Sequence, residues 1–326
     1  MSRSTRRTRL WRGLALLTLA LVVVLAVVGT TLASDNSRSA VGAPDNAKLA
    51  VYSPTSVRDS GLMKNVVIPA FNAAHPGIDV VPTYVGSGAA IQAARDGLAD
   101  VIVVHSPADE KALLAAGDAT LRLPFAYNYF TIVGPKGDPA GVRTATTAAQ
   151  AFRRIARWGK TLTGSKVAFV SRGDASGTNK KELQLWNAAG VTADPAQSPV
   201  GSWYITATGG MLPVLQIAAD KHAYTLTDTA TWLYNRKTLV PALWRLLKKS
   251  ADLKNQYSVL LLNQTMHDQV ASTGAEWLAA WLVSYQGQAA IAKYGVDPKF
   301  DTPGLPTTVV GEPLFFPNAY TISARF

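Results

Sequence analysis

The segment from residue 171 to 178, Ser-Arg-Gly-Asp-Ala-Ser-Gly-Thr, constrains the fold of this chain more than any other feature. It follows the apolar run Val167–Val170, which is typical of a buried strand, and precedes Asn179–Ala189, whose apolar residues recur at helical spacing. Ser176 and Thr178 are residue types common at helix N-caps. The segment therefore predicts a strand, a short loop and a helix start, the unit from which α/β folds are built.

The same loop has features suited to a small anion. The first N–H groups of a helix lack intrahelical partners and carry partial positive charge, and Arg172 adds a full charge. Gly177 lets the backbone come close to a ligand. In the alternative interpretation, Asp174 or Ser176 merely caps the helix and Arg172 pairs with Asp174 on the surface. The loop lacks the Gly-Lys-Ser/Thr ending of a P-loop, so nucleotide hydrolysis is not implied.

Two further turns repeat this order of strand, hydroxyl-rich turn and helix. Ser53-Pro54-Thr55-Ser56 follows an expected strand at Leu49–Tyr52, and Gly86-Ser87-Gly88 follows one at Ile78–Val81. Open α/β sheets bind ligands at the carboxyl ends of their strands, so three such turns together predict one binding site. The expected ligand-binding residues are Ser53, Thr55, Ser56, Ser87, Gly88, Arg172, Ser176, Gly177 and Thr178.

Short apolar runs alternate with helical patterns over most of the chain, which predicts an α/β architecture. The remaining strands are expected at Val101–Val104, Tyr129–Val133, Val167–Val170 and Val259–Leu262. Helices are expected at residues 61–75, 88–97, 147–158, 179–189, 211–221, 228–236 and 276–294. The break at Gly134–Pro139 is typical of a crossing between two lobes, with a return crossing at Tyr257–Asn263.

The first 33 residues predict targeting to a membrane. Residues 1–12 contain five arginines and no acid, and residues 13–33 carry no charge. The apolar stretch is close to the roughly 20 residues that span a bilayer, and the arginines would stay in the cytoplasm. Thr31-Leu32-Ala33 is a weak signal-peptidase site, which slightly favours an uncleaved anchor over a cleaved signal segment. The remainder is then extracytoplasmic.

These patterns divide the chain into six expected parts. They are a basic cytoplasmic N-terminus at 1–12, a transmembrane anchor or signal segment at 13–33, a flexible linker at 34–47, the first part of lobe 1 at 48–130, lobe 2 at 131–258, and the return to lobe 1 at 259–326. The linker assignment rests on its content of Ser, Asn, Asp, Gly and Ala.

Composition argues against several classes of function. The chain has no cysteine, which excludes disulfides, thiolate chemistry and a lipid-modified cysteine. Its four histidines show no metal-binding spacing, and no G-x-S-x-G elbow is present, so an enzyme is disfavoured. Of the formal net charge of +11, five charges lie in residues 1–12, which leaves +6 for the rest. That surplus suits an anion or a membrane surface, and no basic run interleaved with aromatic residues predicts nucleic-acid binding.

Longer motifs occur on both sides of the expected lobe crossing. They are Asp59-Ser60-Gly61-Leu62, Ala99-Asp100-Val101, Tyr127-Asn128, Ile132-Val133-Gly134-Pro135, Ser171-Arg172-Gly173-Asp174, Ser176-Gly177-Thr178, Lys181-Glu182, Tyr224-Thr225-Leu226-Thr227-Asp228 and Pro313-Leu314-Phe315-Phe316-Pro317. In these motifs, from about Leu49 to Ala319, the chain resembles the extracytoplasmic solute-binding proteins of tungstate ABC transporters.

The resemblance implies a two-lobed, type II periplasmic-binding-protein-like fold with a hinge, and a monomer that needs no cofactor. It implies that tungstate, or molybdate, binds between the lobes and is delivered to a permease and its ATPase. Arg172 matches the family's anion-binding arginine. Thr55 and Ser56 match the family's Thr-Thr-Thr-Ser turn, whereas Ser53 and Pro54 depart from it, and Pro54 has neither a hydroxyl nor a backbone N–H.

Two alternatives remain at the level of sequence. Phosphate-binding proteins have a similar loop at Arg172–Thr178, but hydrogen phosphate carries a proton that a carboxylate best accepts. Here His105-Ser106 follows the strand where such an acid is expected, which ranks tungstate and molybdate above phosphate. If His105 faces the ligand, affinity should rise as the pH falls. The other alternative is a membrane-tethered oxyanion sensor without a transport role.

Overall fold

The computed structural model describes residues 47–161, 167–191, 203–247, 250–265, 272–296 and 313–318. The predicted N-terminus at 1–12, the membrane segment at 13–33 and nearly all of the linker at 34–47 lie outside these residues. Among the helices within the described ranges, none combines the length and apolar character that crossing a bilayer requires.

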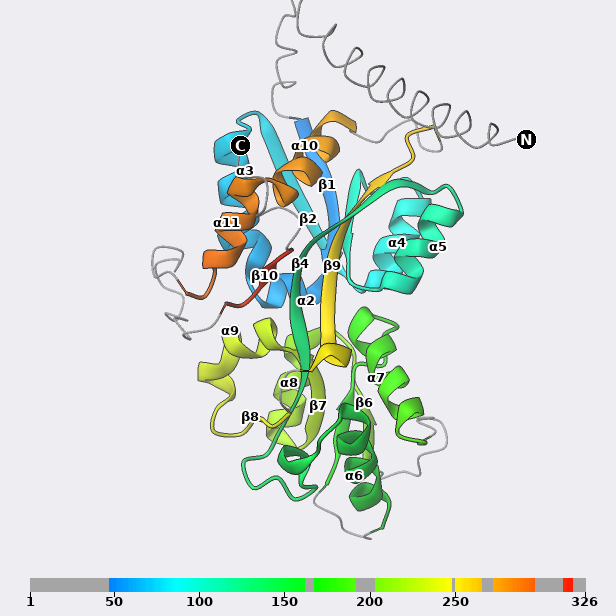
Figure 1. Ribbon diagram of the computed structural model, residues 1–326, viewed down its shortest axis with the longest axis vertical. Helices are drawn as coiled ribbons and strands as arrows, with labels where there is room; N and C mark the ends of the chain where they lie inside the picture. The colour runs from blue at the N-terminus through cyan, green and yellow to red at the C-terminus, as the bar shows by residue number, and fades with distance from the viewer. Residues whose placement is uncertain are drawn as a thin grey trace, which may run out of the picture. The chain divides into compact units, whose positions relative to one another are not determined.

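The strands of the described residues form one mixed sheet in the order β2-β1-β3-β9-β4-β7-β5-β6, and β8 and β10 pair with β4 (Figure 1). Their bounds are β1 Ala47–Pro54, β2 Ile78–Val85, β3 Val101–Val104, β4 Ala119–Gly134, β5 Phe169–Ser171, β6 Tyr204–Thr206, β7 Tyr224–Asp228, β8 Trp244–Arg245, β9 Lys254–Leu262 and β10 Phe316–Pro317. Strands β1, β2 and β3 are parallel to one another, as are β5, β6 and β7, whereas β4 and β9 are antiparallel.

In both halves of the sheet, most of the described helices come after a strand along the chain. Their bounds are α2 Thr55–Asp59, α3 Ile68–Ala74, α4 Ser87–Arg95, α5 Pro107–Ala115, α6 Ala148–Thr161, α7 Gly177–Ala188, α8 Met211–Asp220, α9 Thr229–Leu239, α10 Ser272–Val283 and α11 Tyr285–Lys293. A π-helical turn, η1 at Met63–Val67, leads into α3, and two 3₁₀ turns lie at η2 Val142–Thr144 and η4 Ala251–Leu253.

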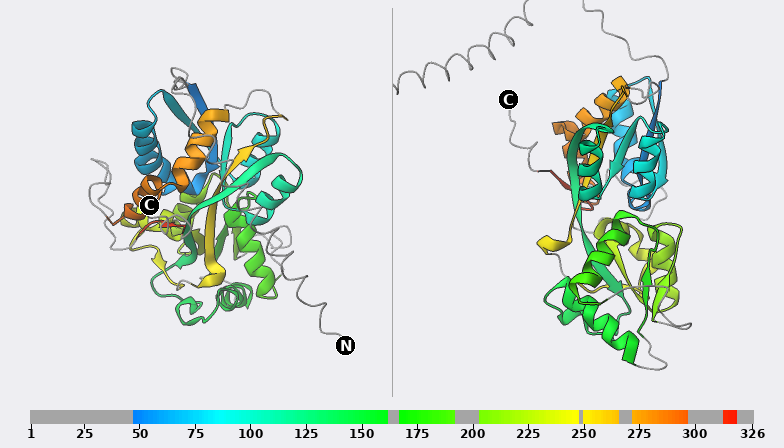
Figure 2. Two further views of the ribbon diagram at one scale, coloured as in Figure 1. Left: turned by 45° about the horizontal axis from the view of Figure 1, so that its top comes forward. Right: turned by 90° about the vertical axis from the view of Figure 1, so that its right-hand side faces the viewer.

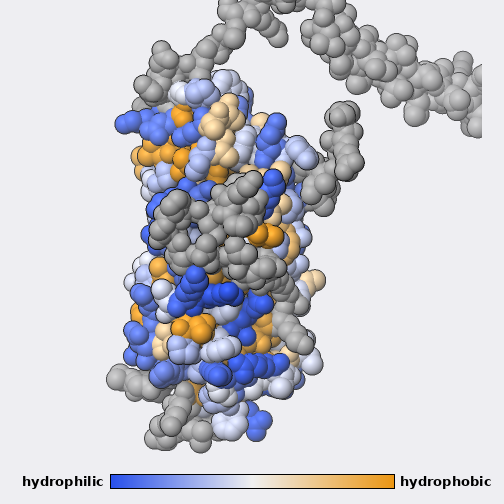
Figure 3. Space-filling model, turned by 90° about the vertical axis from the view of Figure 1, so that its left-hand side faces the viewer, coloured by the Kyte–Doolittle hydropathy of each residue, from blue (hydrophilic) through white to orange (hydrophobic). Residues whose placement is uncertain are grey.

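Two long strands, β4 and β9, join two halves of the structure (Figure 1). Lobe 1 contains β1–β3 with α2–α5, α10 and α11, and lobe 2 contains β5–β8 with α6–α9. The right-hand view of Figure 2 shows the connecting strands along one side of the molecule. On the face shown in Figure 3, hydrophilic residues predominate over lobe 2, and hydrophobic residues form small separate areas among them.

The crossing between lobes lies earlier in the chain than the break at Gly134–Pro139 suggests. Strand β4 pairs with β9 as far as Tyr129 and with β7 from Phe130 onward, so it changes partner within the strand. The return strand β9 pairs with β4 from Lys254, ahead of the expected Tyr257. A Gly/Pro break marks where a strand ends, whereas a change of partner inside a continuous strand leaves no such mark.

Most expected elements are present, with differences at their boundaries. The expected strands all fall on β1, β2, β3, β4, β5 and β9. The expected helix at 61–75 is divided into η1 and α3, and that at 276–294 is divided into α10 and α11. The second division lies at Ser284, whose hydroxyl accepts a hydrogen bond from Gly287 N and so caps a new helix. Helix α5 and strands β6 and β7 were not among the expected elements.

Trp186 on α7 lies at the centre of the core between α6, α7 and the lobe 2 part of the sheet. It is fully buried, with ring centroids 4.4 Å from Phe152 and 5.1 Å from Phe169. Its indole N–H donates to Glu182 Oε1 at 3.0 Å. This core fixes α7, and with it the start of the helix that carries the candidate anion loop.

We expect Trp186→Ala to destabilise the protein by about 3–5 kcal/mol, because it leaves a cavity and removes a donor to Glu182. The midpoint of urea unfolding measures this loss. Leu183→Ala on the exposed side of the same helix is the matched control and should change stability by less than about 0.5 kcal/mol. Equal effects of the two substitutions would contradict this account of the core.

Candidate functional site

Three strand-to-helix turns meet where the two lobes face each other. The turns after β1 and β2 belong to lobe 1, and the turn after β5 belongs to lobe 2. A Cβ placed on Gly86 would lie 3.5 Å from Ser176 Cα, and one placed on Gly88 would lie 3.5 Å from Ala175 O. The structure therefore brings the second and third predicted turns into van der Waals contact.

Four predicted ligand-binding residues have buried hydroxyls without a hydrogen-bond partner among the described residues. They are Ser53, Thr55, Ser87 and Thr178. The β1 and β2 strands are paired in parallel up to Pro54 and Val85, so their turns adjoin, and Thr178 comes from the opposite lobe. Leaving a buried polar group unsatisfied is unfavourable by about 1–3 kcal/mol. Their presence at one junction points to a ligand that accepts hydrogen bonds.

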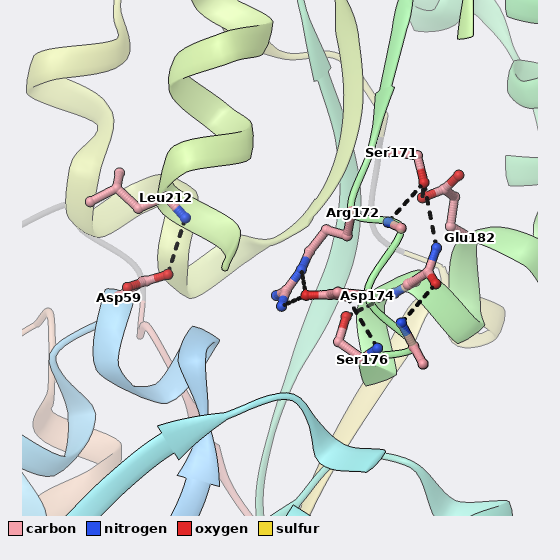
Figure 4. Close-up of polar contacts among 10 residues, drawn as sticks. Asp59, Ser171, Arg172, Asp174, Ser176, Glu182 and Leu212 are labelled. Atoms are coloured by element: carbon pink, nitrogen blue, oxygen red, sulfur yellow. Dashed lines mark hydrogen bonds and ion pairs between the residues drawn. The ribbon is translucent and has the colours of Figure 1, made fainter. Parts of the chain in front are cut away.

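Arg172 supplies positive charge at this junction. Its Nε lies 3.0 Å from Asp174 Oδ2, and its Nη2 also bonds that oxygen (Figure 4). The arginine side chain is only 2% exposed, whereas the aspartate side chain is 20% exposed. The ion pair considered in the sequence analysis is thus present, but its arginine is buried and not on the surface. Among the buried residues of the described ranges, Arg172 is the only Lys or Arg.

Hydrogen bonds around the loop fix its position. Asp174 Oδ1 accepts from Ser176 N at 3.2 Å, so both aspartate oxygens have partners. Ser171 Oγ donates to Glu182 Oε2 at 2.8 Å, and Tyr204 OH donates to Oε1 of the same carboxylate at 2.7 Å. Burial raises the pKa of Glu182, and these donors oppose that effect. Hydrogen bonds to the carboxylates of Asp174 and Glu182 therefore fix the loop, and they do not involve a ligand.

Ser176 caps α7, as the sequence predicts. Its Oγ accepts from Asn179 N at 3.2 Å, which leaves its O–H able to donate to another group. The first intrahelical bond shown for α7 runs from Lys180 N to Ser176 O. The N–H groups of Gly177 and Thr178 precede that bond and belong to the helix positions that have no intrahelical acceptor.

Gly177 has a structural requirement that the sequence did not indicate. A Cβ at this position would lie 2.7 Å from His105 Nε2 and 2.8 Å from His105 O. Both distances are shorter than real Cβ contacts allow, and the second involves backbone. The missing side chain of Gly177 therefore leaves room for His105 of lobe 1 to lie against the start of α7 in lobe 2. This role is additional to any close approach of a ligand to the backbone.

Ser56 differs from the other predicted hydroxyls because it already has a partner. Its Oγ lies 3.3 Å from Tyr257 OH on the connecting strand β9. Asn255 Nδ2 donates to Tyr257 OH at 3.0 Å and to Asn128 Oδ1 at 2.8 Å. Asn128 Nδ2 in turn donates to Asp228 Oδ1 at 2.8 Å. Ser56 thus belongs to a buried polar network between the lobes.

Sequence reasoning assigned no role to the network residues Asn128, Asp228, Asn255 and Tyr257. Tyr127-Asn128 and Tyr224–Asp228 appear in the quoted motifs, so the available signal was the family resemblance alone. Burial raises the pKa of Asp228, and the hydrogen bonds that it accepts from Thr231 and Asn128 oppose this shift. These residues bond β4 to β9 and to the junction of β7 with α9, at the crossing between the lobes.

His105 is a neutral member of the same network. Its Nδ1 lies 2.9 Å from Asn255 Oδ1, and its ring stacks on Tyr257 at 5.0 Å. Because Asn255 uses its amide N–H groups on other partners, its oxygen must accept and His105 Nδ1 must carry the proton. Burial lowers the pKa of His105 to about 4, and the hydrogen bond that the ring donates to Asn255 opposes this shift. The imidazole therefore carries no charge near pH 7.

We expect the ring resonances of His105 in the free protein to show no titration between pH 5 and 8. Burial favours the neutral ring, so its contribution to stability is lost as the pH falls from about 6.5 towards 4. NMR titration measures this, with His105→Gln to assign the signals. The urea-unfolded chain is the control, since its imidazoles titrate near pH 6.5. A midpoint of 6 or above in the folded protein would contradict burial as the dominant effect.

The described residues contain no group of three or more His, Asp or Glu side chains placed to hold a metal ion. The junction instead presents hydroxyls, an arginine and helix N–H groups, all of which donate hydrogen bonds. Its chemistry is that of a binding site for an acceptor-rich anion.

A family described as the PBP superfamily domain matches residues 43–286. The chain belongs to the PBP superfamily. It is 33% identical to the tungstate-binding protein TupA of Peptoclostridium acidaminophilum over 310 residues. The aligned region covers 94% of this chain and 99% of that relative.

Two solved structures show the same fold. The tungstate ABC transporter structure from Geobacter sulfurreducens is 36% identical, with a TM-score of 0.66, and covers 76% of this chain and 100% of its own. The tungstate-binding protein TupA from Desulfovibrio alaskensis is 33% identical, with a TM-score of 0.63, and covers 83% of this chain and 99% of its own. The predicted two-lobed α/β fold and the resemblance to tungstate-binding proteins are confirmed, and the TupA relatives are named as binding proteins, as expected.

Proposed function

We propose that this protein is the extracytoplasmic substrate-binding component of an ABC transporter and binds tungstate, or molybdate, between its lobes. The observation that carries the proposal is the junction of a buried arginine with four buried hydroxyls that have no hydrogen-bond partner among the described residues. The TupA relatives, which are named for tungstate binding, support it. Delivery of the anion requires a permease and its ATPase as partners, and binding requires no cofactor.

The donors at the junction favour a fully ionised anion. Tungstate and molybdate are dianions that only accept hydrogen bonds, whereas hydrogen phosphate also needs an acceptor for its proton. The carboxylate nearest to Arg172 is Asp174, and both of its oxygens already accept hydrogen bonds within the loop. We therefore place Ser53, Thr55, Ser87, Arg172, Ser176 and Thr178 as the donors, with Gly88 and Gly177 admitting close approach and Ser56 supporting the turn.

Pro54 limits what the first turn can donate. It occupies the N-cap position of α2 with φ −64° and makes no side-chain bond to the helix. It supplies no N–H and no hydroxyl. We therefore assign donation from this turn to the hydroxyls of Ser53 and Thr55 on either side of Pro54, which are buried and have no partner in the described part of the chain.

We expect calorimetric titration to show tight binding of tungstate or molybdate, and none of hydrogen phosphate, whose proton needs an acceptor, under identical buffer conditions. Arg172→Ala should weaken binding by about 100-fold or more, because bonds to a charged group contribute about 1.5–3 kcal/mol each. Arg95→Ala, which removes an arginine from an exposed ion pair with Asp118, is the matched control and should bind like the wild type. Phosphate binding alone, or full affinity in Arg172→Ala, would overturn the proposal.

We also propose that the binding unit is a monomer, with lobe boundaries at 48–130, 131–258 and 259–326. We further propose that residues 13–33 tether the protein to the membrane through the linker at 34–47. The charge-free apolar stretch after five arginines supports the tether. Alkaline carbonate extraction of membranes tests it. The full chain should stay with the membrane pellet, and recovery in the supernatant would favour a cleaved signal segment.

A further inference from the structure

Asp59 connects the lobes without belonging to the predicted site. It ends the short helix α2 of lobe 1, and its Oδ2 accepts a hydrogen bond from Leu212 N of lobe 2 at 3.0 Å (Figure 4). The residue is 6% exposed. Asp59 is also part of the motif Asp59-Ser60-Gly61-Leu62, to which the proposed function assigns no role.

Helix α8 has no cap of its own. Its N-cap residue is Gly210, which has no side chain to accept from the helix and adopts φ +104°. Leu212 is the second residue of the helix, so its N–H is among those that need an external acceptor. A carboxylate is favourable here because it accepts the bond and lies near the positive end of the helix dipole. Asp59 therefore caps α8 from the opposite lobe.

The helix start and α2 are in close contact around this bond. A Cβ on Gly210 would lie 3.1 Å from Arg58 Nη2 and 3.3 Å from Thr55 Oγ1. Asn235 Nδ2 of α9 donates to Asp59 O at 2.8 Å, a second bond from lobe 2 to the same residue. Thr55, a proposed ligand donor, thus lies one helical turn before Asp59, whose hydrogen bonds join α2 to lobe 2.

Asp59 is not suited to contact an anion. Its Oδ1 accepts from Arg58 Nε at 2.8 Å, and its Oδ2 accepts from Leu212 N, so both oxygens are engaged. A carboxylate against a dianion would also be repulsive. Its contribution is to the arrangement of the lobes and not to the ligand.

We propose that Asp59 is the positioning residue that holds the lobes closed, by capping α8 across the junction. The bond exists only while α2 lies against the start of α8, so it favours the closed arrangement and slows release of the bound anion. This inference rests on the proposed function for its effect on release, whereas its effect on lobe closure does not depend on the ligand.

The absence of native cysteine allows a direct measurement of closure in the full chain. Spin labels at Lys111→Cys on α5 and Lys160→Cys on α6, both exposed, report the distance between lobes by pulsed EPR. In the free protein, Asp59→Ala should shift the distribution to longer distances, and Asp59→Asn, which keeps an acceptor, should retain most of the closed population. Asp118→Ala, which breaks an exposed ion pair within lobe 1, is the control and should leave the distribution unchanged. An unshifted distribution in Asp59→Ala would overturn the proposal.

Stopped-flow release of tungstate and molybdate tests the effect on binding. Asp59→Ala should accelerate dissociation about 3- to 30-fold, the range expected for loss of a helix cap, with the same factor for both anions. A change in the ratio of the two rates would mean that Asp59 contacts the ligand and would contradict the proposal. A wild-type chain that binds neither anion would refute the proposed function, and a shifted EPR distribution in Asp59→Ala would still support the cap.

Discussion

The pairing of β4 with β9 is the constraint on which the site depends. Strand β4 changes partner from β9 to β7 between Tyr129 and Phe130, so one continuous strand belongs to both lobes. The polar residues Asn128 and Asn255 lie at this crossing and are bonded to each other. Because the crossing joins the lobes, it sets which strand ends face each other. Turns that lie more than 80 residues apart in the chain, at Ser87 and Ser176, are brought into contact as a result.

The positive charge of Arg172 at the junction is paired within its own loop. A buried arginine alone is unfavourable, and Asp174 supplies the opposite charge from the same loop. The hydroxyls of Ser53, Ser87 and Thr178 have no hydrogen-bond partner among the described residues. These hydroxyls are therefore the groups that gain most from an anion. Arg172 is already paired with Asp174, whereas these hydroxyls lack partners in the described residues. We therefore expect the geometry of the donors, and not charge alone, to select the anion.

The sequence predicted the local chemistry of the site better than its tertiary contacts. Strand, turn and helix-cap signals placed Ser53, Thr55, Ser87 and Thr178 in strand-to-helix turns, because such signals act within a few residues. The contact of Gly177 with His105 and the cap from Asp59 to Leu212 join residues far apart in sequence, and nothing local marks them. Periodicity also missed the division of the helix at Ser284, since both halves keep apolar spacing.

Anomalous diffraction from crystals grown with tungstate would locate the bound anion, because tungsten scatters strongly and its position can be found without assumptions about the protein. The proposed site requires one tungsten position at the junction of the lobes, with tungstate oxygens within hydrogen-bonding distance of Arg172 and of the hydroxyls of Ser53, Thr55, Ser87 and Thr178. A tungsten position elsewhere, or a junction in which those hydroxyls contact other protein groups while tungstate is bound, would contradict it.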